Sequence, residues 1–115
     1  MSYVDGYVLA VPKDRLDDYK KMAEQGRDCW MKHGALSYVE ALADDVPYGE
    51  LTSFPRAVQA KDDEVVIFSF ATYRDRAHRD EVMAKVMEDM KMNPEDMPFD
   101  GKRMIWGGFK AFVQA

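Results

Sequence analysis

The segment EVVIFSFATY, residues 64–73, is apolar on both of its alternating faces. A strand with this pattern lies inside a sheet that is covered on each side, because successive side chains of a strand point to opposite faces. The segment is therefore predicted to be a central strand. Near the end of the chain, RMIWGGFKAFV from Arg103 to Val113 follows the tight turn Asp100–Gly101 and is also apolar on both faces. It is predicted to be the last strand.

Two more segments are typical of strands. Tyr3 to Val11 is rich in β-branched and aromatic residues and is closed by Pro12. Leu36 to Ala43 alternates, with Leu36, Tyr38, Glu40 and Leu42 on one face. Glu40 is thereby placed among apolar neighbours.

Two helices are predicted between these strands. The first begins after Asp14, which is expected to cap it, and ends at Gly34. Its inward stripe repeats at three- and four-residue steps through Leu16, Tyr19, Ala23, Gly26, Trp30 and His33. The second helix follows Asp75 and ends near Asn93–Pro94, with an inward stripe made of Val82, Met83, Val86, Met87 and Met90.

The resulting order is strand, helix, strand, strand, helix, strand. It predicts an α+β fold with a ferredoxin-like βαββαβ protomer, in which one domain spans residues 1–115 and two helices lie on one face of a four-stranded antiparallel sheet. Two helices cover only one face, so a second copy of the chain is expected on the other, giving a homodimer. A monomer with one partly wet face is the alternative.

The loop from Asp44 to Asp63 has no sustained period and is broken by three residues that favour turns: Pro47, Gly49 and Pro55. A loop of this length in a small domain tends to be a lid, a binding loop or an arm that packs on a partner. We expect it to be ordered and packed across the partner or over the cleft, because it carries Leu51, Phe54 and Val58, which would otherwise be exposed.

The composition excludes some partners. The formal net charge of -5 repels phosphate backbones and anionic lipid, so neither nucleic acid nor membrane is expected as a partner. No stretch reaches the roughly 20 apolar residues that span a bilayer, and the stretch MSYVDGYVLAVPKDR has no basic start followed by an apolar run. The single cysteine, Cys29, cannot form an internal disulfide and fits a reducing compartment. The cytoplasm is the expected location.

Two residues are candidates for catalysis. Histidine is the side chain type that changes charge near neutrality, and His33 shares a helical stripe with Trp30. It can equally complement the dipole at the end of its helix. Glu40, among apolar neighbours, can serve as a general acid or base, or it can point to solvent at a strand edge.

Six residues are candidates for ligand binding, and each also has a structural interpretation. Trp30, Tyr38 and Trp106 can line a pocket or fill the core. Arg103 and Asp100, beside the last turn, can clamp a carboxylate or fix the turn. The full set is Trp30, Tyr38, Arg56, Asp100, Arg103 and Trp106; for Arg56 in the long loop, a surface or inter-subunit ion pair is the competing role.

Neither metal nor cofactor is expected. The two histidines and the cysteine show no CxxC or HExxH spacing, and no GxGxxG or GxxxxGK[ST] loop is present. Gly107–Gly108 inside a strand indicates a bulge or a close backbone approach. A methionine-rich group can line an adaptable pocket, although helical spacing favours core filling: Met83, Met87, Met90, Met92 and Met97.

Three stretches together resemble the YbaA-like bacterial proteins, a domain-of-unknown-function family: MSYVDGYVLAVPK, VEALADDVPYGELTSFPRAVQAKDDEVVIFSFATYRDR and MPFDGKRMIWGGF. The resemblance covers nearly the whole chain. It implies the dimeric α+β barrel superfamily, in which two ferredoxin-like protomers pack sheet against sheet. That superfamily includes cofactor-independent monooxygenases, haem-handling enzymes, lyases and members without established activity, so no catalytic residues are implied.

Two function classes remain. In the first, each protomer binds a small organic ligand between helices and sheet. If that protein is an enzyme, the residues favour cofactor-independent chemistry of monooxygenase or proton-transfer type, with His33 or Glu40 as base and Arg103 stabilising negative charge. In the second, the protein is a non-catalytic dimeric binding or interaction module. The polar residues then stabilise turns and the interface.

Overall fold

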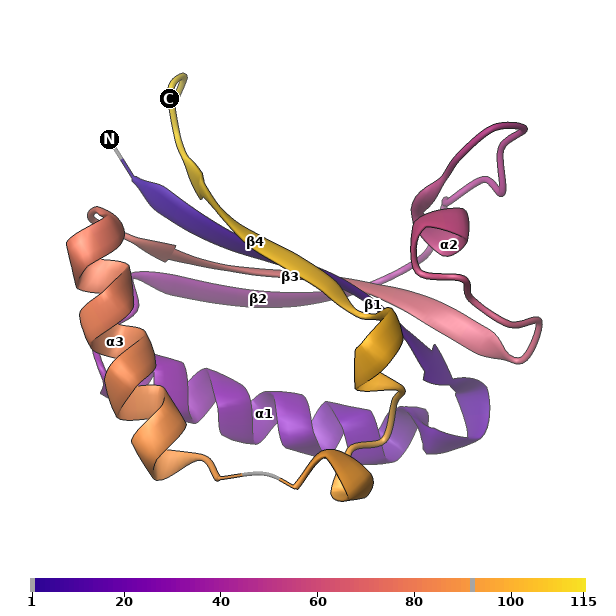
Figure 1. The fold of residues 1–115 in the computed structure, drawn as a ribbon, viewed down its shortest axis with the longest axis horizontal. Helices are drawn as coiled ribbons and strands as arrows, with labels where there is room; N and C mark the ends of the chain where they lie inside the picture. Colours follow the sequence, from indigo (N-terminus) through magenta and orange to yellow (C-terminus); the bar gives the residue numbers. More distant parts are fainter. Residues whose placement is uncertain (1, 92) are drawn as a thin grey trace.

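The computed structural model describes residues 2–91 and 93–115 (Figure 1). Within them, strands and helices alternate in the predicted order. The elements are β1 (Tyr3–Pro12), the 3-10 helix η1 (Lys13–Arg15), α1 (Leu16–Lys32), β2 (Ser37–Leu42), α2 (Phe54–Ala57), β3 (Glu64–Tyr73), α3 (Arg76–Asp89), the 3-10 helices η2 (Pro94–Asp96) and η3 (Gly101–Arg103), and β4 (Ile105–Lys110).

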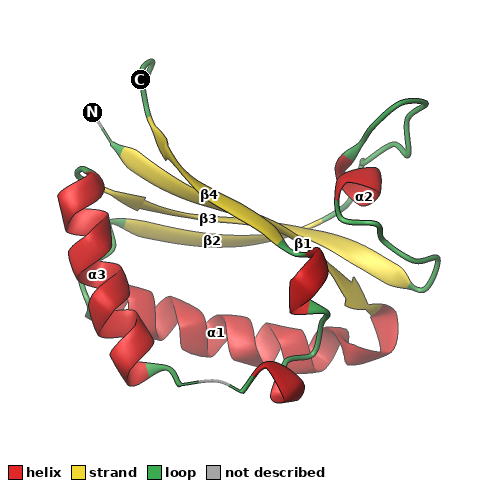
Figure 2. Cartoon of the chain, in the orientation of Figure 1, coloured by secondary structure: helices red, strands yellow, loops and turns green. Residues whose placement is uncertain are grey.

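The sheet is antiparallel with strand order β2-β3-β1-β4, which is the ferredoxin-like topology. β1 and β3 are central and pair along their full length, from Tyr3 opposite Tyr73 to Pro12 opposite Glu64. Both long helices, α1 and α3, cover one face of the sheet, whereas α2 lies on the other side of the sheet, near one end of the strands (Figure 2). The predicted fold class is confirmed.

The two faces of the sheet carry different side chains. The face toward α1 and α3 holds the buried core in two clusters, one around Tyr73 and Val82 and the other around Leu9 and Tyr19. The opposite face is apolar and mostly exposed; we call it the open face and define it by Val39, Phe68, Phe70, Ile105 and Phe109. Burial of β3 on both sides is thus only partly achieved within one chain.

Helix boundaries follow the predicted signals at Asp75 and Gly34 but not at Asp14, and α3 already ends at Asp89, so that Asn93–Pro94 marks a fresh 3-10 turn. Asp75 caps α3 by accepting a hydrogen bond from the His78 N–H at 2.8 Å. Gly34, at φ +107°, ends α1 in a conformation that favours glycine. The Asp14 cap is wrong, because a 3-10 turn inserts before α1 and Arg15 occupies the cap position without a side-chain bond.

The segment 44–63 contains the short helix α2. The Ser53 hydroxyl caps it by accepting from the Arg56 N–H. Val58 is 1% exposed and packs on Ala10 and Val66, on the same side of the sheet as the open face. The segment therefore covers one end of that side and does not close over the space between helices and sheet. Leu51 stays 95% exposed.

β4 is shorter than predicted, since it ends at Lys110 and not at Val113. The strand is at the sheet edge, and Trp106 and Phe109 remain largely exposed. The expected close approach at the glycine pair is confirmed at Gly108, where a Cβ would collide with the Tyr3 ring. No helix in the described part of the chain is both long and apolar enough to cross a membrane.

Candidate functional site

A cavity of about 290 Å³ lies between the two long helices and the sheet. Its wall is mostly apolar and rich in methionine, with Met22 from α1, Met83, Met87 and Met90 from or just after α3, and Met97 and Met104 from the segment leading to β4. Tyr7, Tyr19, Trp30, Tyr38 and Phe99 add aromatic surface. Helical spacing favours core filling for the methionine-rich group, but Met83, Met87, Met90 and Met97 also line this cavity, while Met92 lies outside the described residues.

Glu40 supplies a carboxylate to this cavity. Its Oε1 accepts a hydrogen bond from the Tyr19 hydroxyl at 2.7 Å, and its Oε2 accepts one from the Tyr38 hydroxyl at 2.6 Å. None of the ion pairs among the described residues involves Glu40. A carboxylate has about four lone-pair positions, so the two phenols leave one on each oxygen for a ligand.

Secondary structure explains why these groups meet. Tyr38 and Glu40 are two apart on β2, so both side chains point toward α1. Tyr19 and Gly26 lie two turns apart on the facing side of α1. Gly26 makes room for the Tyr38 hydroxyl, because a Cβ there would stand 2.8 Å from that oxygen.

The phenols around Glu40 are fixed as donors. Burial raises the pKa of Tyr19 and of Tyr38, and the nearby Glu40 raises both further. Burial likewise raises the pKa of Tyr7 to about 12. These hydroxyls consequently stay protonated at neutral pH, and those of Tyr19 and Tyr38 donate to the Glu40 carboxylate.

A second opening reaches the same carboxylate from the outside. A groove of about 310 Å³ runs between α1 and β2 and is also lined by Tyr19, Tyr38 and Glu40. Its wall includes the charged side chains of Lys20, Glu24 and Arg27. Glu40 thus lies between an apolar chamber and a groove with charged side chains of both signs.

Of the predicted site residues, the structure brings three together at the cavity: Trp30, Tyr38 and Glu40. The Trp30 and Tyr38 rings lie 5.4 Å apart between centroids. The Trp30 Nε1 donates to the Tyr73 hydroxyl at 3.1 Å, which fixes the indole in the wall.

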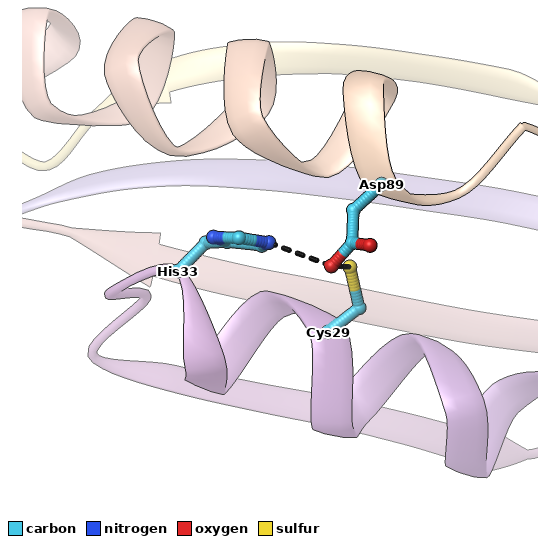
Figure 3. A group of neighbouring side chains, drawn as sticks. All are labelled: Cys29, His33 and Asp89. Carbon is cyan, nitrogen blue, oxygen red and sulfur yellow. Dashed lines mark hydrogen bonds and ion pairs between the residues drawn. The ribbon is translucent and has the colours of Figure 1, made fainter.

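His33 lies elsewhere, between the C-terminal ends of α1 and α3. Its Nε2 is 2.9 Å from Asp89 Oδ2, and Cys29 Sγ is 3.9 Å from the same oxygen (Figure 3). His33 is outside the described lining of the cavity. The structure therefore does not bring His33 and Glu40 to one cleft.

The loop and turn residues are also remote from the cavity. Arg56 donates to the Tyr48 and Gly49 carbonyl oxygens, each at 3.0 Å, and holds the loop. Arg103 forms two 2.7 Å bonds to the Glu64 carboxylate and one of 3.0 Å to Asp100. The contacts of Arg56, Arg103 and Asp100 are therefore those of a structural role, because these side chains hold the loop and the last turn.

Trp106 lines a neighbouring cavity of about 300 Å³ between β1, β4 and α3. There it stacks on Tyr7, with centroids 6.5 Å apart. The same cavity holds Asp5, 1% exposed, which accepts from Arg79 at 2.6 Å. Burial raises the pKa of Asp5, and Arg79 offsets part of that rise.

Two side-chain contacts at these cavities are not predicted from the sequence: that of Tyr19 with Glu40 and that of Arg79 with Asp5. Tyr19 was placed on the inward stripe, but its link to Glu40 depends on how α1 crosses β2. The ion pair of Asp5 and Arg79 had a signal, because an aspartate within an apolar strand needs a partner when it is buried. Its partner lies 74 residues away.

The fold and this cavity define the class of protein as a ferredoxin-like α+β protomer with an apolar chamber between helices and sheet. A solved structure described as a dimeric ferredoxin-like protein, from an uncultured marine organism, matches with a TM-score of 0.60, 12% identity and 100% coverage of both chains. At that identity the likeness shows the fold alone.

The family follows from the sequence. Residues 2–101 match a family described as protein of unknown function, DUF1428. The chain is 46% identical over 115 residues to the uncharacterized protein YbaA of Escherichia coli strain K12, and equally to that of Shigella flexneri, covering 98% of each chain. The chain therefore belongs to the DUF1428 family, which confirms the resemblance.

Proposed function

We propose that each protomer binds a small, largely apolar organic molecule in the methionine-lined cavity and anchors it through a donor group on Glu40. The observation that carries the proposal is a carboxylate with one phenol on each oxygen and no cationic partner at the floor of an apolar chamber. Small-molecule sites combine apolar walls with a few convergent polar groups in this way.

The cavity restricts the ligand. A volume of about 290 Å³ is at the lower end of the range for small-molecule pockets, about 300–1,000 Å³. Methionine side chains adapt their shape and make favourable contacts with aromatic rings. A planar aromatic or enolisable compound with a hydroxyl group matches both features, with its hydroxyl donating to Glu40.

For such a ligand, cofactor-independent proton transfer is the chemistry that the residues support. The Glu40 carboxylate would accept a proton from the bound donor and become neutral, leaving the negative charge on the ligand. Tyr19 and Tyr38 hold the carboxylate in place. Lys20 lines the outer groove that shares Glu40 and is the cation there that could balance an anionic ligand, because Arg27 on the same groove already pairs with Asp28.

We also infer a homodimer that buries the open face, working in the cytoplasm. The apolar side chains of Phe68, Ile105 and Phe109 are exposed together on that face, and a two-fold dimer would cover them with the same patch. Cys29 is a free thiol, which supports a reducing compartment. If no ligand is found, this surface favours the second function, a dimeric interaction module.

A thermal-shift screen with small hydroxylated aromatic compounds tests the ligand proposal, because binding to the folded state raises Tm. We expect hits with the parent protein, and at least a tenfold weaker Kd for Glu40→Gln. Glu88→Gln, an exposed change on α3, is the matched control and should bind as the parent does. Equal binding by Glu40→Gln would show that the carboxylate is not the anchor.

A further inference from the structure

The C-terminal ends of α1 and α3 meet at a cluster of three possible metal ligands. Cys29 and His33 are one helical turn apart on α1, so their side chains point the same way. Asp89, the last residue of α3, reaches between them (Figure 3). The Sγ, Nε2 and carboxylate oxygen atoms all lie within 4.8 Å of one another.

These separations are close to those of a tetrahedral zinc site. Zn–S bonds of about 2.3 Å and Zn–N or Zn–O bonds of about 2.0 Å place neighbouring ligand atoms about 3.3–3.6 Å apart. Asp89 Oδ2 is 2.9 Å from His33 Nε2 and 3.9 Å from Cys29 Sγ. Small rotations of the three side chains would therefore bring their atoms around one ion.

We propose that Cys29, His33 and Asp89 bind one thiophilic divalent cation of the Zn²⁺ type per protomer, with a water in the fourth position. The donor set supports this metal class, because thiolate and imidazole select Zn²⁺ and its neighbours over Mg²⁺ and Ca²⁺. Sulfur, nitrogen and carboxylate oxygen together form a usual zinc environment with one open position.

Binding follows a simple proton balance. The Cys29 thiol loses its proton to solvent as the sulfur–metal bond forms. The proton that His33 Nε2 shares with Asp89 Oδ2 moves through solvent to Nδ1 of the same ring, and the ion takes a position between Nε2 and Oδ2. Lys32 Nζ, 3.4 Å from Asp89 Oδ2, has an exposed side chain and is free to swing to solvent.

The site is separate from the ligand cavity, since none of its three residues is in the described lining. Its neighbours Trp30 and Met90 are in that lining. A bound ion would tie the end of α3 to α1 and fix this wall. Short sequence motifs do not indicate this site, because Asp89 is 56 residues from His33 along the chain.

Titration with Co²⁺, followed by absorption, tests the site on the full protein. Because Cys29 is the single cysteine, a thiolate-to-cobalt charge-transfer band can come only from its sulfur. We expect this band to saturate at one Co²⁺ per protomer and to disappear when Zn²⁺ displaces the cobalt. We also expect Zn²⁺ to raise Tm.

Variants decide which residues hold the ion. Cys29→Ser should abolish the charge-transfer band, while His33→Ala and Asp89→Asn should each weaken Zn²⁺ binding at least tenfold. Glu88→Gln, beside Asp89, should bind as the parent does. His33→Cys should restore binding with a stronger band from two thiolates. The proposal is overturned if the parent shows no band, or if Asp89→Asn and His33→Ala bind Zn²⁺ as tightly as the parent.

Discussion

The two faces of the sheet differ in how much of each is covered within one protomer. The face under α1 and α3 is covered, and its polar groups are paired: Glu40 with two phenols, and Asp5 with Arg79. The open face has apolar side chains in its centre and is covered only at one end, by Val58 of the 44–63 segment. One face is covered within a protomer, and the other leaves apolar side chains exposed.

Substitutions on the two faces should therefore have different effects. Substitutions on the open face should alter assembly and leave the interior of the protomer intact. Substitutions under the helices should alter stability or the cavity without changing the partner. The following four predictions test that separation, from the largest expected effect to the smallest.

Phe109→Asp should dissociate the dimer. Phe109 is 64% exposed on the open face, and a carboxylate buried there without a cation costs several kcal/mol. We expect about 4 kcal/mol of association free energy to be lost, or about a thousandfold in Kd. Sedimentation should change from twice 13.2 kDa to 13.2 kDa.

Met31→Asp is the control for Phe109→Asp, because Met31 is exposed on α1, away from the open face. It should leave the dimer intact. A parent protein that sediments as a monomer at micromolar concentration would contradict the assignment of the open face.

Arg79→Met should destabilise the covered face by about 3 kcal/mol at neutral pH, because it leaves the buried Asp5 carboxylate without its cation. The pKa of Asp5 is already raised by burial, and it should rise further in the variant. A carboxyl group with a raised pKa in the folded state binds its proton more tightly there than in the unfolded chain, so protonation of Asp5 favours folding. The loss of unfolding free energy in the variant should therefore shrink as pH falls. Urea unfolding over a pH series measures it.

Arg76→Met, on the exposed start of the same helix, controls for the loss of a positive charge. Its unfolding free energy should match the parent within about 0.5 kcal/mol. An equal loss in both variants would mean that the pair of Arg79 and Asp5 has no special role.

Arg103→Ala should cost about 2 kcal/mol at pH 7, because Glu64, 3% exposed, loses two hydrogen bonds. Those bonds lower the pKa of Glu64 below the ordinary 4.5. The stabilisation is therefore complete above about pH 4.5 and is lost as pH falls through the lowered value. Parent and variant should converge in acid, whereas Lys102→Ala should follow the parent at every pH.

Gly26→Ala should have the smallest effect on stability, within about 1 kcal/mol. Alanine favours the helix by about that amount, but its Cβ would push the Tyr38 hydroxyl away from Glu40. In a Tyr38→Phe background, which lacks the hydroxyl, the same change should be stabilising. Thermal unfolding of the four proteins measures the coupling, and an absent coupling would mean that Gly26 does not position Tyr38.

Much of this architecture was predictable. Period-two and period-3.6 patterns gave the order of elements, and the two-sided apolar pattern of β3 indicated a second layer on the open face. Glu40 was placed among apolar side chains by alternation alone. Where local signals failed, as at Asp14, a 3-10 turn had changed the start of the helix.

The site itself was predictable only in part. Trp30, Tyr38 and Glu40 share the cavity, as their faces indicated, but His33 was expected there and pairs with Asp89 instead. A helical stripe curves around the axis, so its last members need not face the same space as its first. Arg103 likewise turned toward Glu64, 39 residues away.

The sequence alone determined the elements, the inward and outward positions along each and the need for a covered second face, because these depend on local periodicity and on the burial of apolar area. The tertiary structure decided which polar groups meet. Glu40 with Tyr19, Asp5 with Arg79, and Cys29 and His33 with Asp89 join different elements. Such contacts depend on sheet register and on the angle at which each helix crosses the sheet, which no local pattern in the chain specifies.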